Sequence, residues 1–126
     1  MQIAECKMKN EGINISERLL NFASGVIKLV IKFNKTPAGY HIAAQLTRSA
    51  TSCGANYEEA CGAESRNDFL HKMQIVLKEL KESLYWLRLI EKSELYSGGN
   101  LHILQNEAGE LIRIIAKSII TAKSNK

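Results

Sequence analysis

The chain has 126 residues, of which 45% are hydrophobic and 24% are charged, a composition typical of one globular domain with a single core. One proline and few aromatic residues disfavour a β-sandwich, in which each turn usually needs its own chain-breaking residues. The formal net charge of +4 makes anionic partners plausible, although basicity of this size is also common on ordinary solvated surfaces.

Cys6, Cys53 and Cys61 form an odd set without CxxC spacing. If Cys53 and Cys61 share one helix, they lie about 12 Å apart at ~1.5 Å per residue, too far for a disulfide. We therefore expect all three to be small core residues in a reducing compartment. With no signal-like N-terminus and no apolar run of ~18 residues, the sequence predicts a cytoplasmic protein without membrane contact.

The first helix is expected over about residues 15–33, after a flexible N-terminal arm at 1–13. Asn14 and Glu17 have capping-box spacing at its start. Apolar residues then recur every three or four positions, which predicts one buried face: Ile15, Leu19, Phe22, Val26, Val30 and Phe33. Leu20, Ile27 and Ile31 are expected to widen that face.

The second helix is expected over about residues 40–61, because Pro37 and Gly39 read as chain breakers. Its buried face is lined mainly by small side chains, and Gly54 in its middle indicates close packing against a neighbour or a local kink. Third and fourth helices are expected over about 66–93 and 100–123, each with an apolar stripe. Residues 14–126 therefore predict an all-α, antiparallel up-down four-helix bundle.

Apolar residues outside the main stripes suggest an additional buried surface. Trp86 and Ile75 lie beside the stripe of the third helix, and Ile103 and Ile114 beside that of the fourth. One interpretation is a wide core with a few exposed apolar side chains. The other is a subunit interface, so we expect a homo-oligomer.

The sequence does not indicate an enzyme. Glu58 and Glu59 are adjacent, so on a helix they point about 100° apart. His41, His71 and His102 are isolated and lack metal-ligand spacing. We expect no catalytic residues, no cofactor and no metal.

Two kinds of partner remain open. Lysine and arginine side chains on helix faces could contact the phosphates of structured RNA or DNA, and the candidates are Lys28, Lys32, Lys78, Lys81, Arg88, Lys117 and Lys123. Alternatively, the chain is a protein–protein adaptor without nucleic-acid contact. Its anchors would then be Ile75, Tyr85 and Trp86, since aromatic residues concentrate interface energy.

The run QLTRSATS at 45–52, followed by GANYEEA at 54–60 and YWL at 85–87, resembles the bacterial four-helix-bundle family. Its members are also called 23S rRNA intervening-sequence proteins. The resemblance implies a four-helix bundle that assembles as a ring-shaped homopentamer, with no settled activity. A related branch, the accessory variability determinant of diversity-generating retroelements, works with a reverse transcriptase and nucleic acid.

The family's shared polar residues correspond to Arg48, Ser52, Asn56 and Glu59. Their spacing places them on one face of the second helix. We expect a hydrogen-bond network between helices or between subunits, with Arg48 meeting a carboxylate from a neighbour. A ligand or RNA-phosphate site is the alternative.

Overall fold

The structure is a computed structural model that describes residues 6, 14–33 and 35–124. It contains four long helices, α2 (Ile15–Val30), α3 (Pro37–Cys61), α4 (Arg66–Lys92) and α5 (Gly99–Ser124). The described residues contain no strand, so the prediction of an all-α four-helix bundle is confirmed. The predicted N-terminal arm, apart from Cys6, lies outside the described residues.

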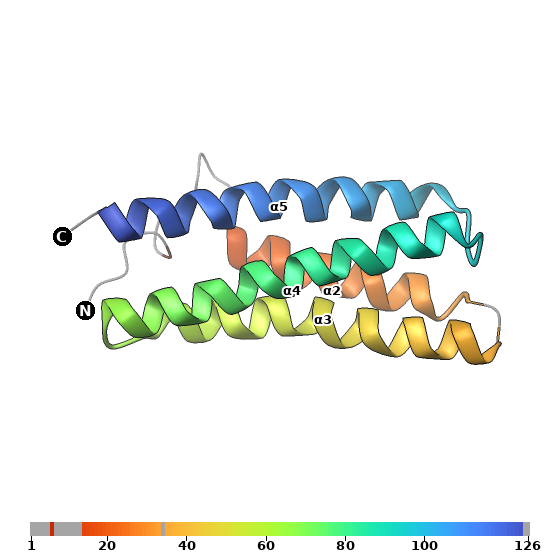
Figure 1. Ribbon diagram of the computed structural model, residues 1–126, viewed down its shortest axis with the longest axis horizontal. Helices are drawn as coiled ribbons and strands as arrows, with labels where there is room; N and C mark the ends of the chain where they lie inside the picture. The colour runs from red at the N-terminus through yellow and green to blue at the C-terminus, as the bar shows by residue number, and fades with distance from the viewer. Residues whose placement is uncertain (1–5, 7–13, 34, 125–126) are drawn as a thin grey trace.

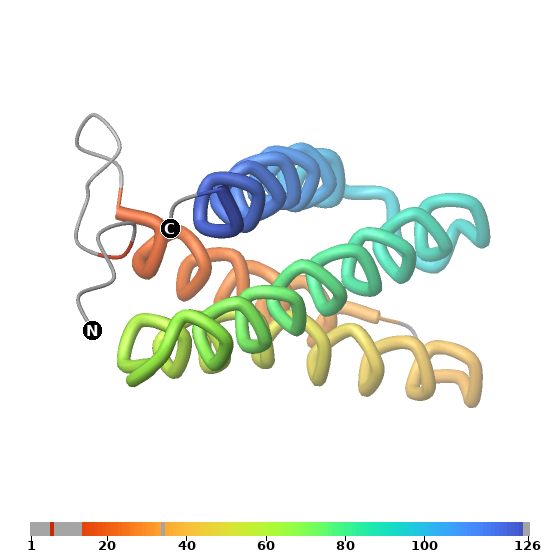
Figure 2. Tube along the Cα trace, turned by 60° about the vertical axis from the view of Figure 1, so that its left-hand side comes forward, coloured from red at the N-terminus to blue at the C-terminus, as the bar shows by residue number. Residues whose placement is uncertain are grey.

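Each helix packs against its neighbour in sequence, and α5 closes the bundle by packing on α2. Short links make consecutive helices antiparallel (Figure 1). The helices therefore follow the order α2, α3, α4, α5 around the core, and α4 lies diagonally across from α2 (Figure 2). The outer faces of α2 and α4 therefore lie on opposite sides of the bundle.

The core is built from one stripe of each helix. One buried cluster contains residues of α2 (Leu19, Phe22, Val26 and Leu29), of α4 (Phe69, Met73, Val76, Leu80 and Leu87) and of α5 (Leu101, Leu104, Leu111 and Ile115). Burying each large apolar side chain contributes roughly 1.5–3 kcal/mol before the entropy of ordering it is subtracted. The α3 stripe is smaller, with Ala50, Cys53 and Ala60 buried. At Gly54, an added Cβ would lie 3.6 Å from Leu19 Cβ, so α2 approaches α3 closely there.

One prediction about α2 is wrong. Leu20, Ile27 and Ile31 do not widen the core face; their exposed fractions are 61%, 44% and 74%. Leu20 and Ile27 each follow a fully buried residue, and a step of one residue turns a helix by about 100°. They therefore emerge on the flank of α2.

Side-chain caps fix the starts of α3 and α4. The backbone N–H of Gly39 donates to Thr36 Oγ1 at 3.0 Å, and that of Asp68 donates to Ser65 Oγ at 3.0 Å. Because proline is well suited to the first helical position, α3 begins at Pro37, earlier than the expected start near residue 40. The chain breaker in the sequence is thus part of the helix.

At the end of α4, Glu94 adopts the left-handed conformation with φ of 59°. The backbone N–H of Leu95 then donates to the carbonyl of Ile90 at 3.1 Å, the bond that characterises a Schellman motif. Glu94 therefore occupies the position usually taken by glycine.

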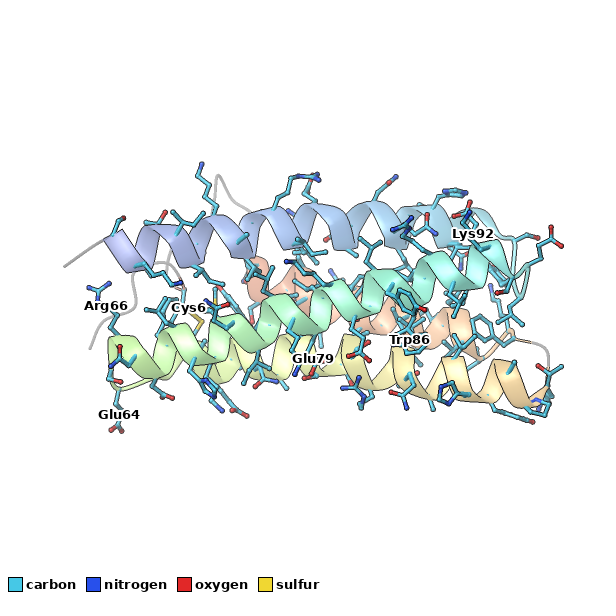
Figure 3. The ribbon with its side chains drawn as sticks, in the orientation of Figure 1. Cys6, Glu64, Arg66, Glu79, Trp86 and Lys92 are labelled. Atoms are coloured by element: carbon cyan, nitrogen blue, oxygen red, sulfur yellow. A yellow bond between two sulfur atoms is a disulfide. The ribbon has the colours of Figure 1, made fainter. Side chains whose placement is uncertain are left out.

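The expectation that all three cysteines are reduced core residues is wrong for two of them. Cys6 and Cys61 form a disulfide that joins positions 55 residues apart, with their Cα atoms separated by 5.5 Å (Figure 3). Cys53 is a free, buried thiol. Helical spacing excludes a Cys53–Cys61 bond, but it gives no information on Cys6, which precedes the periodic part of the sequence.

None of the described helices combines the length and the apolarity needed to cross a membrane.

Candidate functional site

Arg48 joins the middle of α3 to α4. Its Nη1 atom donates to Glu79 Oε1 at 3.2 Å, and its Nη2 atom donates to Glu82 Oε2. Glu79 is buried, with an exposed fraction of 8%, whereas the Arg48 side chain is about half exposed. The hydrogen bond to Glu82 is the largest cause of a raised pKa of Arg48. The expected carboxylate partner of Arg48 thus comes from the adjacent helix of the same chain.

Trp86 extends this cluster toward solvent. Its indole Nε1 donates to Glu82 Oε2 at 3.0 Å, and this bond, followed by the one from Arg48, lowers the pKa of Glu82. The ring of Tyr85 contacts Trp86 edge to face at a centroid distance of 5.1 Å, and His41 of α3 does so at 6.0 Å. Trp86 therefore lies at the α3–α4 seam, as Figure 3 shows, and three aromatic rings follow one another across that seam.

The four polar residues predicted on α3 do not form one network. Asn56 Nδ2 donates to the backbone carbonyl of Ser52 at 3.0 Å and to its Oγ at 2.9 Å, within the same helix. Glu59 instead forms an ion pair with Lys72 of α4 at 2.7 Å. Arg48, Asn56 and Glu59 thus make three separate sets of contacts along one helix face.

A buried polar pair was missed by the sequence analysis. Ser49 Oγ and Ser83 Oγ lie 2.8 Å apart between α3 and α4, and both residues are fully buried. The spacing of Ser83 from Glu79, one helical turn earlier, was a usable signal, because it places both on the α3-facing side of α4.

Basic side chains form a line along the outer face of α4. Lys78, Lys81, Arg88 and Lys92 are all exposed and recur at helical spacing, together with the exposed Tyr85. We call these four cations the α4 basic line. Among the described residues, no member of the line forms an ion pair, although the charge of Lys78 contributes to the lowered pKa of Glu82.

The other predicted cations are not part of this line. Lys28 lies on α2, diagonally across the bundle from α4, and Lys32 follows the end of α2. Lys117 and Lys123 are exposed on α5. The structure therefore groups three of the seven predicted nucleic-acid contacts, Lys78, Lys81 and Arg88, and places the other four on α2, just after α2 and on α5.

An apolar groove of about 590 Å³ runs between α2 and α3. Small side chains form half of its lining, which includes Ala23, Ser24, Thr51, Gly54 and Ala55. Leu20 and Ile27, both exposed, also line it, and Glu17, Lys28 and Glu58 add charge. We call it the α2–α3 groove. Of the three predicted interface residues, none lines it; Ile75 and Trp86 are half-buried and Tyr85 is exposed on α4.

Residues 11–117 match the 23S rRNA-intervening sequence protein family. The match covers most of the chain, including all of α2, α3 and α4. The chain belongs to this family.

The crystal structure of a similar protein has the same fold. This protein from Bacteroides thetaiotaomicron VPI-5482, described as a protein with unknown function from the S23 ribosomal protein family, superposes with a TM-score of 0.77. It is 31% identical, and the similarity covers 83% of this chain and 97% of that one. No curated protein matches the chain. Membership of the 23S rRNA-intervening sequence family thus fixes the fold without supplying an activity.

The described residues contain no group of three or more histidine, cysteine, aspartate or glutamate side chains arranged to hold a metal ion. Two surfaces of this 23S rRNA-intervening sequence protein remain as candidate binding sites. One is the α4 basic line with its aromatic neighbours, and the other is the α2–α3 groove.

Proposed function

We propose that this protein is a non-enzymatic homo-oligomer that binds nucleic acid through the α4 basic line. The observation that carries the proposal is the division of charge on α4. Of its acidic side chains, Glu79 and Glu82 bond to Arg48 of α3, and Glu91 lies against His102 and Gln105 of α5. Lys78, Lys81 and Arg88 are exposed and form no ion pair among the described residues. Lysine and arginine in such a line would displace counterions from phosphates.

The α2–α3 groove supports the oligomeric part of the proposal. A groove lined by small side chains lets another helix approach closely, and Leu20 and Ile27 would be removed from water by such contact. Because α2 lies diagonally across from α4, subunits that meet at the groove leave the α4 basic line accessible. The family resemblance leads us to propose a pentameric ring.

The experiment is a salt titration of binding to labelled RNA and DNA, with two variants of equal charge. One variant replaces Lys78, Lys81 and Arg88 by glutamine, and its control replaces Lys28, Lys117 and Lys123 by glutamine. All six residues are exposed, so both variants should fold. The first should bind more weakly and reduce the slope of log K against log salt by about 2 to 3, while the control should change much less.

Equal losses in both variants would mean that only net charge matters and would contradict the assignment to α4. Binding that is insensitive to salt would contradict the proposal itself. Light scattering after size exclusion tests the assembly, and Leu20→Glu/Ile27→Glu should shift the protein toward monomers. Oligomers that persist in this variant would exclude the groove as the interface.

The alternative is a protein–protein adaptor that does not touch nucleic acid. The exposed Tyr85 favours it, since its exposed fraction is 58%. Trp86 supports it less, because its indole N–H already donates to Glu82 and its ring packs on the core. A specific protein partner lost on Tyr85→Ala, without any nucleic-acid binding, would favour the adaptor.

A further inference from the structure

We infer that the preferred ligand is single-stranded nucleic acid, one of whose bases stacks on Tyr85. This inference rests on the proposed function, because it assumes that the α4 basic line binds phosphates. The inference adds that the ligand is single-stranded and that Tyr85 is the residue that distinguishes a single strand from a duplex.

The first observation is the position of Tyr85 within the α4 basic line. It follows Lys81 by one helical turn and precedes Arg88 by about one turn, and all three side chains are exposed. A phosphate backbone that follows the line would pass cations on both sides of the tyrosine ring. Alternation of cations with an aromatic ring is the arrangement by which proteins hold unpaired strands.

The second observation is that the ring is held in place. Tyr85 contacts Trp86 edge to face, with 74° between the ring planes. Trp86 is itself fixed, because its Nε1 donates to Glu82, its ring packs against the core and the ring of His41 lies beside it. A ring with restricted rotation loses little conformational entropy when a base stacks on it, which favours binding.

The third observation is the low density of competing acidic groups. Glu82, the nearest carboxylate to Trp86, accepts hydrogen bonds from both Trp86 and Arg48. These two donors compensate its charge and hold it on the α3 side of the helix. Glu91, one turn after Arg88, accepts a hydrogen bond from Gln105 of α5 at 3.0 Å and lies 3.4 Å from His102 Nε2. A phosphate beside Tyr85 would therefore meet Lys81 and Arg88 in preference to a carboxylate without a partner.

The bases of a duplex are stacked on one another and are not available to Tyr85, whereas every unpaired base offers a π-face. Phosphate contacts alone would bind both single strands and duplexes, since both carry phosphates. The structure thus assigns the preference for single strands to one side chain and the general affinity to the surrounding cations.

The test uses the full chain, a labelled oligodeoxythymidylate and a labelled blunt-ended DNA duplex of equal phosphate number. Binding is followed by the anisotropy of the label. A separate titration with unlabelled strands follows Trp86, the only tryptophan in the chain, by its intrinsic fluorescence. The single strand should bind more tightly and should quench Trp86, because a base on Tyr85 lies next to the indole.

Tyr85→Ala should weaken binding of the single strand by roughly 5- to 150-fold, the loss expected for one stacked base, and should leave duplex binding nearly unchanged. Tyr85→Phe keeps the ring and should bind the single strand like the wild type. Circular dichroism should show equal helix content in all three proteins, since Tyr85 is exposed.

The outcomes separate this inference from the proposed function. Both ligands could bind with strong salt dependence while Tyr85→Ala leaves the affinity for the single strand unchanged and Trp86 fluorescence is not quenched. That result would support binding by the α4 basic line and would exclude stacking on Tyr85. If neither ligand binds, both the inference and the proposed function are wrong. The inference would also be wrong if Tyr85→Ala lost a protein partner while its binding of the single strand stayed unchanged.

Discussion

Arg48 and Glu79 bond across the α3–α4 seam, with Nη1 and Oε1 3.2 Å apart, although Glu79 is almost completely removed from solvent. A buried carboxylate without a donor is costly, because its desolvation is no longer compensated. The pair therefore explains why an acidic residue is tolerated beside the buried Leu80.

Arg48→Met should lower the free energy of unfolding by about 1–2 kcal/mol, because Glu79 loses its charged donor. The loss is kept moderate by the half-exposed Arg48 side chain, which leaves the pair partly screened by water. Urea unfolding of Arg48→Met, Glu79→Gln and the double variant measures it. Strictly additive effects of the two substitutions would contradict a direct interaction.

Glu82 should make stability depend on acid pH. Its pKa is lowered in the folded protein, chiefly by the Trp86 indole and then by Arg48. A carboxyl group with a lowered folded pKa stabilises the fold above its unfolded pKa of about 4.3 and loses this effect as the pH falls through the folded pKa. The difference in unfolding free energy between wild type and Glu82→Gln should be constant near neutrality and should shrink in acid. A constant difference down to the acid end would contradict this cause.

The disulfide between Cys6 and Cys61 should stabilise the oxidised protein. It closes a loop with a sequence separation of 55 residues, for which the loss of chain entropy in the unfolded state gives at most about 4 kcal/mol. Reductant should therefore lower the urea midpoint of the wild type. Cys6→Ser is the control, and its midpoint should not respond to reductant. Identical midpoints for the oxidised and reduced wild type would exclude a stabilising bond.

Cys53 should resist alkylation in the folded protein. Burial raises the pKa of its thiol to about 12, and the nearby charge of Glu79 acts in the same direction. At mildly alkaline pH the thiolate is therefore scarce as well as inaccessible. Mass spectrometry after iodoacetamide treatment of the oxidised protein should show labelling of Cys53 only after denaturation. Rapid labelling without denaturant would mean that the α3–α4 seam opens readily.

Glu94→Gly should stabilise the protein by about 1 kcal/mol, because glycine adopts the left-handed conformation at the end of α4 without the steric cost of a Cβ. Ser93→Gly is the matched control at the preceding residue. Ser93 has φ of −87°, so glycine there only increases the entropy of the unfolded chain and should be neutral or destabilising. Thermal melts should show a raised midpoint for Glu94→Gly and an unchanged or lowered midpoint for Ser93→Gly, and a destabilised Glu94→Gly would contradict the argument.

The positions of the four helices could be predicted because apolar periodicity and capping residues are local signals. Asn14, expected at the start of the first helix, accepts a hydrogen bond from the backbone N–H of Glu17 as its N-cap. Ser65 does the same for Asp68 at the start of α4. The left-handed Glu94 could not be predicted, since nothing in its residue type favours that conformation. Leu20 and Ile27 were misplaced because hydrophobicity alone does not distinguish a wide core from an exposed flank.

The candidate site was only partly predictable for a different reason. Exposure of Lys78, Lys81 and Arg88 follows from their spacing within one helix. The bonds from Arg48 to Glu79 and Glu82, and the Cys6–Cys61 disulfide, depend on how separate segments are aligned in space. A single sequence contains the residue types for these contacts but not the register that brings them together.

The diagonal placement of α2 and α4 has a consequence for affinity. If subunits assemble through α2 and α3, each adds one α4 basic line to the outside of the same particle. A nucleic acid long enough to reach two lines would then bind the second at a high effective concentration, and its avidity could exceed that of one line by roughly 10²- to 10⁴-fold. Short oligonucleotides would report only the weak single-line affinity, so ligand length should govern binding as strongly as any one side chain.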